Sequence, residues 1–146
     1  MQKLLAIIRP FAIPLAWLQA MVAMVGSLYG SEILKFTPCN LCWYQRIALY
    51  PQTIILAIAM FRGDKKVWMY ALPLAALGWL FGLYQNLLYY GVIPETIALC
   101  TNSTPCTTRY MSLFGFIDFP QLSLLALTVI IVLLFISREP KSSVIK

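Results

Sequence analysis

Four cysteines are the residues of this sequence with the clearest chemical potential, and they fall into two close pairs. Cys39 and Cys42 form a C-x-x-C motif, and Cys100 and Cys106 are separated by five residues. The chain of 146 residues contains no histidine. That absence excludes Ser-His-Asp triads, Cys-His nucleophile pairs and His-ligated zinc sites. With these histidine-dependent sites excluded, redox chemistry between paired thiols is the remaining candidate.

The C-x-x-C motif favours reversible redox chemistry over a structural cross-link. A disulfide between Cys39 and Cys42 would close a very short loop and so add little stability, and this spacing is typical of thiol–disulfide exchange. Pro38 precedes the motif and an apolar run follows it, which predicts that Cys42 lies at the first turn of a helix. Unpaired backbone N–H groups and the helix dipole favour a thiolate there. Arg46, four residues on, shares a helix face with Cys42, and its charge would lower the pKa of the thiol further.

Simpler interpretations remain open for these residues. Cys100 and Cys106 are equally compatible with a structural disulfide, and Arg46 with an anchor at the membrane interface. A metal site would need four thiolates, and the five-residue gap does not fit a zinc ribbon, so no metal is expected.

The elements that position these residues are predicted to be transmembrane helices. The chain is 61% hydrophobic and only 11% charged, which excludes a soluble globular enzyme. Uncharged runs cover 10–31, 47–61, 67–94 and 119–137, against about 20 apolar residues needed to cross a bilayer. The first run is too long for a signal peptide and lacks a clear cleavage site. We expect an all-α membrane protein with a single domain, 1–146, containing four helices near 11–30, 43–61, 67–90 and 118–137 and a polar tail, 138–146.

The basic residues predict the orientation of the helices. With a cytoplasmic N-terminus, eight of the eleven Lys and Arg residues lie on the cytoplasmic side and three outside. The positive-inside rule favours this topology, with both termini cytoplasmic and two extracytoplasmic loops that carry the cysteines. That side is oxidising, which suits disulfide chemistry. The net charge of +6 then describes topology, and no nucleic-acid partner is expected.

The electron acceptor is inferred by elimination. Two thiols that become a disulfide release two electrons, and the sequence carries no haem or flavin fingerprint. A lipid-soluble acceptor of two electrons within the bilayer would be a quinone.

The segment from Cys39 to Pro51 resembles the signature of the DsbB/BdbC family of membrane disulfide-forming proteins. It contains C-x-x-C, an arginine four residues later, and then Tyr50-Pro51. The segments 82–88 and 100–120 also resemble the family, so the resemblance covers most of the chain and is closest to the shorter BdbC branch. A vitamin-K-epoxide-reductase-like protein is the rival redox class, but its C-x-x-C lies later in the chain.

The resemblance implies a bacterial cytoplasmic (inner) membrane enzyme, a protein-dithiol:quinone oxidoreductase. An extracytoplasmic DsbA- or BdbD-like partner with a thioredoxin fold would be reoxidised through Cys100, which forms the mixed disulfide. Cys106 would then attack Cys39, and the Cys42 thiolate, supported by Arg46, would meet a membrane quinone (menaquinone or ubiquinone).

Two departures from the family pattern matter. Many relatives carry a histidine near the outer end of the third helix, where this chain has Gln85-Asn86. Gln85 can donate a hydrogen bond to a quinone but cannot carry a proton at neutral pH, and hydrogen bonding between helices is the alternative role. The short ring between the second pair contains Thr104-Pro105, and its strain would make that disulfide more oxidising. Outside the redox classes, the alternative is a non-enzymatic membrane scaffold or assembly factor with two structural disulfides.

Overall fold

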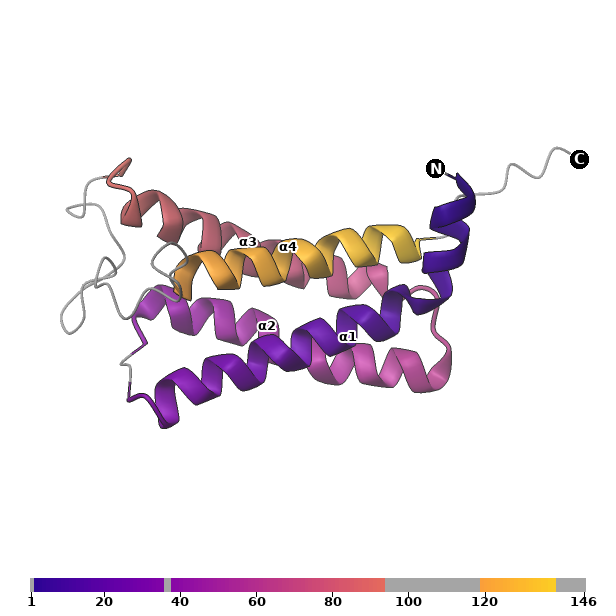
Figure 1. Ribbon diagram of the computed structural model, residues 1–146, viewed down its shortest axis with the longest axis horizontal. Coiled ribbons are helices and arrows are strands. Elements are labelled where there is room, and N and C mark those ends of the chain that lie inside the picture. The colour runs from indigo at the N-terminus through magenta and orange to yellow at the C-terminus, as the bar shows by residue number, and fades with distance from the viewer. Residues whose placement is uncertain (1, 36–37, 94–118, 139–146) are drawn as a thin grey trace, which may run out of the picture.

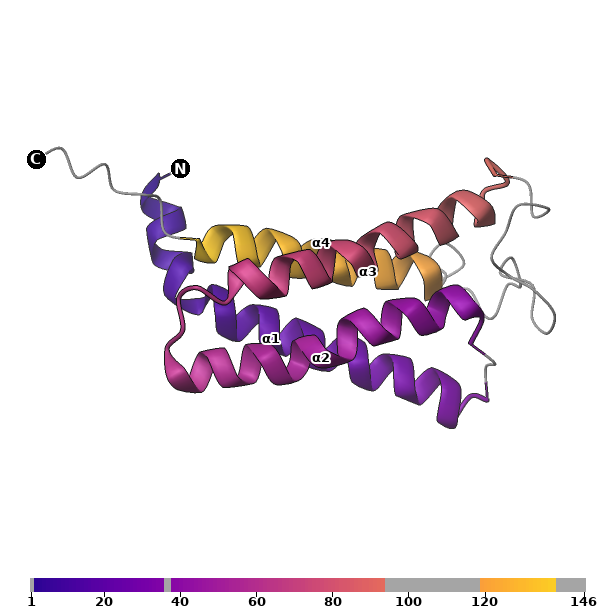
Figure 2. The ribbon, with the colours of Figure 1, turned by 180° about the vertical axis from the view of Figure 1, so that it is seen from behind.

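The computed structural model is all-helical in the residues that it describes, 2–35, 38–93 and 119–138 (Figure 1). It contains four helices in these ranges: α1 (Gln2–Glu32), α2 (Asn40–Arg62), α3 (Trp68–Tyr89) and α4 (Phe119–Ser137). The helices lie side by side, and each packs on two neighbours in the cyclic order α1, α2, α3, α4 (Figure 2). The predicted all-α bundle is thus confirmed.

Three of the described helical segments are long and apolar enough to cross a membrane: Ile8–Glu32, Trp68–Tyr89 and Pro120–Ser137. The α2 helix has a sufficient length of 23 residues but carries Gln45, Arg46 and Gln52, which lower its hydropathy. Many large apolar side chains face outward, among them Val22, Ile54 and Leu80, as is expected where lipid replaces water around a bundle.

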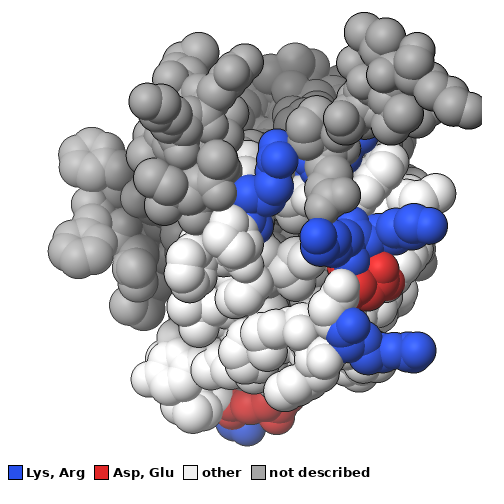
Figure 3. Space-filling view, turned by 90° about the vertical axis from the view of Figure 1, so that its right-hand side faces the viewer, with Lys and Arg blue, Asp and Glu red and all other residues white. Residues whose placement is uncertain are grey.

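The two ends of the bundle differ in what they carry. The start of α1, the turn between α2 and α3 and the end of α4 lie at one end (Figure 1). Several Lys and Arg side chains gather there (Figure 3). The beginning of α2, with the C-x-x-C motif, lies at the opposite end. Which end faces the cytoplasm stays a prediction, based on the positive-inside rule.

The helix boundaries differ from the expected ones mainly in α1. The helix includes residues 2–10, before the expected start near 11, and it contains Pro10 and Pro14. Its first turns bend away from the rest of the helix (Figure 1). Proline removes a backbone donor and displaces the preceding turn, which accounts for a bend at this position. The charges of Lys3 and Arg9 therefore do not end the helix.

Small residues bring α2 and α3 into close contact. A Cβ atom built on Gly78 would lie 2.8 Å from the Ala48 Cβ and 3.4 Å from a Leu127 methyl group. Short side chains allow this close approach of helices in membrane bundles.

Gly78→Ala should therefore destabilise the bundle. The Ala48 Cβ is fixed to its backbone, so α2 and α3 must separate, at a cost of about 1–3 kcal/mol for an overpacked core. Thermal unfolding in detergent measures the effect. Gly26→Ala on α1 is the matched control, because nothing lies within 4 Å of its added Cβ atom. Equal melting temperatures for the two variants would contradict the tight packing at Gly78.

Candidate thiol-redox site

The first cysteine pair is positioned by the start of α2. Cys39 is the N-cap residue, with φ −70° and ψ 169°, and Cys42 is the third residue of the helix. The Cys39 carbonyl accepts the Trp43 N–H at 3.1 Å and begins the helical hydrogen bonding. N-cap and third-position side chains face each other across the first turn, as in a capping box. The C-x-x-C spacing thus brings two sulfurs together at a helix N-terminus.

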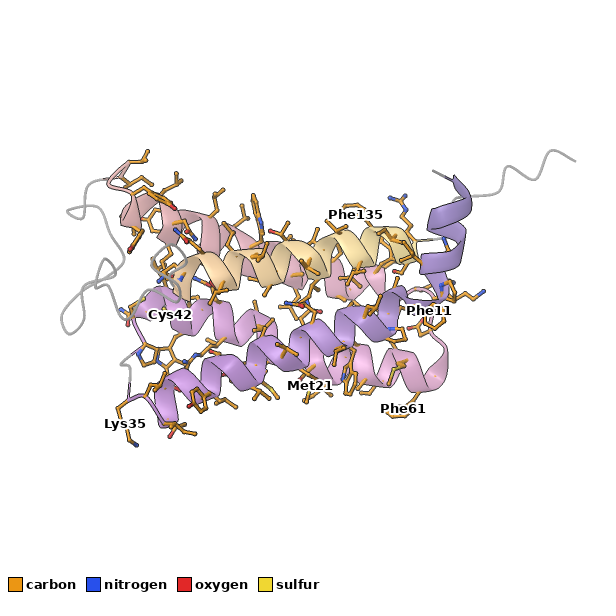
Figure 4. All side chains as sticks on the ribbon, viewed as in Figure 1. Phe11, Met21, Lys35, Cys42, Phe61 and Phe135 are labelled. Carbon is orange, nitrogen blue, oxygen red and sulfur yellow. The ribbon has the colours of Figure 1, made fainter. Side chains whose placement is uncertain are left out.

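The two sulfurs are in contact but not bonded. Their separation is 3.1 Å, and both cysteines are free thiols. A disulfide needs an S–S distance of about 2.05 Å, so only a small side-chain movement separates this arrangement from a bond. Figure 4 shows Cys42 at the same end of the bundle as Lys35, with Phe11 and Phe61 at the opposite end.

The two thiols are electrostatically unequal. Both precede residue 43, where the second span is expected to begin. The pKa of Cys42 is lowered, first by the hydrogen bond from the Cys39 thiol, then by one from Gln85 and by the charge of Arg46. The pKa of Cys39 is raised, first by its hydrogen bond to Cys42 and then by burial. Cys42 is therefore the more readily ionised thiol of the pair.

Gln85 contacts both sulfurs directly. Its side-chain Nε2 donates to the Cys39 Sγ at 3.4 Å and to the Cys42 Sγ at 3.3 Å. The residue is buried near the end of α3, with only 2% of its surface exposed. The structure thus brings Gln85, predicted as a quinone ligand or a helix–helix contact, to the sulfurs themselves.

Arg46 lies beside the site but does not donate to the sulfurs. Its Nη2 donates to the Ser27 carbonyl of α1 at 2.9 Å, and its guanidinium lies 5.7 Å from the Trp43 ring centroid. The charge of Arg46 lowers the pKa of Cys42, while the hydrogen bonds to the Cys42 sulfur come from Cys39 and Gln85.

Apolar side chains surround the deeper sulfur. Cys39 is 7% exposed and packs with Leu41 and Leu88, and the adjacent Cys42 is only half-buried. Phe81 and Tyr84 of α3 complete this cluster. Cys39 is therefore the less exposed residue of the pair.

Two polar residues at this site are absent from the sequence-based prediction, the buried Gln45 and the partly buried Ser123. The Ser123 hydroxyl donates to the Gln45 side-chain oxygen, and the Gln45 amide nitrogen donates to the Gln85 oxygen. Gln45 follows Cys42 by three residues, and this spacing predicts that the two side chains leave α2 on the same side. Ser123 carries no comparable signal.

The second cysteine pair, Cys100 and Cys106, lies outside the described residues, as does the predicted tail from 139 onward. Within the described ranges, no three Cys, Asp or Glu side chains come together as a possible metal site.

Comparison of the sequence with known proteins shows to which family this chain belongs. The family model described as "Disulfide bond formation protein DsbB" matches residues 9–137. The chain belongs to the DsbB family. Its relatives within the DsbB family include the "Disulfide bond formation protein C" of Bacillus subtilis, 43% identical over 131 residues, which covers 87% of this chain and 92% of the relative.

Other DsbB-family relatives are equally similar. The "Probable disulfide formation protein C 2" of Bacillus cereus is 43% identical over 132 residues, 90% of this chain and 94% of the relative. A "Probable disulfide formation protein" of Coxiella burnetii is 44% identical over 123 residues, 82% of each chain. No solved structure is significantly similar. The resemblance seen in the cysteine motif is confirmed, and this DsbB-family chain is a membrane protein of disulfide bond formation.

Proposed function

We propose that this protein reoxidises an extracytoplasmic thioredoxin-like oxidase and transfers the electrons to a membrane quinone. The observation that supports the proposal most strongly is the paired thiols at the start of α2. The two sulfurs are in contact, the pKa of Cys39 is raised, and the pKa of Cys42, beside Gln85 and Arg46, is lowered. This asymmetry suits a thiol pair that accepts electrons on one sulfur and passes them on from the other.

The proposed sequence of exchanges begins at the second pair. A thiolate of the partner attacks Cys100 and breaks the Cys100–Cys106 disulfide, so that Cys106 leaves as a thiolate. Cys106 attacks the Cys39 sulfur of a Cys39–Cys42 disulfide, and Cys42 leaves as a thiolate. The partner's second thiolate attacks its own sulfur in the mixed disulfide, which closes the partner's disulfide and releases Cys100 as a thiolate. Cys100 then attacks Cys106, so that the outer disulfide forms again and Cys39 is released. The partner is then oxidised, and the first pair holds two electrons.

The residues around Cys42 suit a quinone. When bound, a quinone supplies an acceptor for the two electrons and two protons that the dithiol loses on closing to a disulfide. Arg46 uses its Nη2 for Ser27 and has further donors for a carbonyl oxygen, beside the exposed ring of Trp43. An open groove of about 450 Å³ lies on the same half of α1 as Ser27 and suits an apolar tail; it is lined by Met21, Val22, Val25, Gly26 and Tyr29.

Trapping free thiols in membranes with and without respiratory quinone tests this proposal. We expect Cys39 and Cys42 to become reduced, and therefore alkylated, when quinone is depleted, and to reoxidise when quinone is restored. In a control with Cys100 and Cys106 both replaced by serine, electrons from the partner cannot reach the first pair, so depletion should change nothing. A scaffold with two structural disulfides would show no change in either protein, which would refute the proposal.

A further inference from the structure

A chain of side-chain hydrogen bonds connects three helices to the cysteine pair. The Ser123 hydroxyl of α4 donates to the Gln45 Oε1 of α2, and the Gln45 Nε2 donates to the Gln85 Oε1 of α3. The Gln85 Nε2 then donates to both cysteine sulfurs. Gln45 and Gln85 are 5% and 2% exposed, so water does not replace these contacts. We call Ser123, Gln45 and Gln85 the amide relay.

The relay has a direction because an amide group accepts at one end and donates at the other. The Gln85 oxygen is occupied by the Gln45 amide nitrogen, which leaves the Gln85 nitrogen to face the sulfurs. The Ser123 hydroxyl shares its single proton between the Gln45 Oε1 and the Pro120 carbonyl, 2.9 Å away, and this donation favours the oxygen end of the Gln45 amide on the Ser123 side. If the Gln45 amide flipped, its oxygen would face Gln85. The Gln85 amide would then have to flip to donate to it, which would direct the Gln85 oxygen at the sulfurs. An oxygen there would repel a thiolate.

The packing around Gln45 is shaped to hold this arrangement. Gly82 of α3 lies beside this amide: a Cβ atom there would be 3.6 Å from the Gln45 Oε1, an ordinary contact, and 3.3 Å from a Leu124 methyl group. Asn86 donates to the carbonyls of both Gly82 and Pro120, at 2.8 and 3.1 Å. These bonds fix the first turn of α4 against α3, and Ser123 lies one turn further along α4. The hydroxyl is therefore held at the height of Gln45.

We propose that Ser123 and Gln45 are positioning residues that keep the amide nitrogen of Gln85 directed at the sulfurs and so favour Cys42 as a thiolate. This inference deepens the proposed function and rests on it for its purpose, since a thiolate is the form that donates electrons. Among the described residues, the other ionisable groups near the pair are Arg46 on α2, Tyr84 on α3 and Cys39 itself. All of these are unchanged in the variants below.

The pH dependence of Cys42 alkylation tests the relay without quinone or partner. The full-length protein is reduced, treated with iodoacetamide across a pH range, and Cys42 modification is measured on its peptide by mass spectrometry. Gln85→Met removes the donor and should raise the midpoint by about one pH unit. Ser123→Ala and Gln45→Met should each raise it by about half a unit, because Gln85 then spends part of its time reversed. Ser123→Thr, which retains a hydroxyl, should restore the midpoint.

Matched controls separate the relay from general effects of polar substitution. Ser137→Ala removes a hydroxyl of α4 that donates to the Leu134 carbonyl, and Gln52→Met removes a buried α2 amide that donates to the Ala71 carbonyl. Neither should move the midpoint. In a Gln85→Met background, Ser123→Ala should add no further shift, because the relay acts only through Gln85.

Two results would overturn the relay: no shift in Ser123→Ala and Gln45→Met while Gln85→Met shifts, or a shift by Ser123→Ala that persists in the Gln85→Met background. Either leaves the proposed function standing. Conversely, the relay variants could shift the midpoint of Cys42 alkylation as expected while quinone depletion leaves the redox state of Cys39 and Cys42 unchanged. That result would refute the proposed function and leave the relay standing.

Discussion

Replacing Cys42 by serine is expected to abolish quinone reduction while the bundle stays folded. A serine hydroxyl is close in size but has no accessible two-electron oxidation, so the first pair can neither form a disulfide nor pass electrons on. Turnover with partner and quinone should fall by at least about 10³-fold, to the uncatalysed background. The measurement is absorbance-monitored quinone reduction by purified protein with the reduced partner.

Cys39→Ser is the matched variant for this experiment. Both variants should lose turnover, but they should differ in the thiol that remains. Cys42, half-buried and close to Gln85 and Arg46, should react with iodoacetamide at neutral pH about tenfold faster than the buried Cys39. Turnover in Cys42→Ser within tenfold of the unmodified protein would refute the role of Cys42. Equal reactivity of the two thiols would contradict the asymmetry of the pair.

The fold was largely predictable because helices that face lipid have long uncharged, apolar sequences. The exceptions have physical causes. Charged Lys3 and Arg9 suggested a boundary, yet α1 begins at Gln2, because helical backbone can continue beyond the apolar core of a membrane. The α2 helix has the weakest hydropathic signal since it carries Gln45, Arg46 and Gln52. Those polar residues face neighbouring helices instead of lipid.

The site was predictable only where a residue acts at a fixed spacing along one helix. Cys39, Cys42 and Arg46 follow from their three- and four-residue separations on α2, and their place at the helix start agrees with the expectation. That Gln85 would contact sulfur, and that Ser123 would reach Gln45, depends on how α3 and α4 are rotated against α2. One sequence does not encode such rotations in any local pattern.

The position of Arg46 shows the same limit. The spacing predicts that its side chain leaves α2 on the face of Cys42, but the hydrogen-bonding partner is the Ser27 carbonyl, contributed by α1. The guanidinium is thus held between α1 and the Trp43 ring, beside the thiolate and not on it. This geometry leaves donors free for an electron acceptor, which makes the arginine separable from thiol exchange.

Arg46→Ala should accordingly weaken quinone reduction by about 10- to 100-fold, the effect of losing hydrogen bonds between a charged donor and a reacting oxygen. Disulfide exchange with the partner should change by no more than about threefold, because the sulfurs keep their contacts with each other and with Gln85. Stopped-flow measurement of partner oxidation in the absence of quinone isolates exchange, and steady-state turnover with varied quinone isolates the second step.

Two further variants give this prediction its controls. Arg46→Lys retains the charge but lacks the planar fork that can hold Ser27 and an acceptor together, so its quinone reduction should fall between those of the alanine variant and the unmodified protein. Arg62→Ala removes a basic residue at the opposite end of α2 and should leave both steps unchanged. Equal loss of exchange and quinone reduction in Arg46→Ala, or loss of neither, would contradict the assigned role. The first outcome would indicate that Arg46 holds α1 against α2 through Ser27, and the second that its charge acts only as an anchor at the membrane surface.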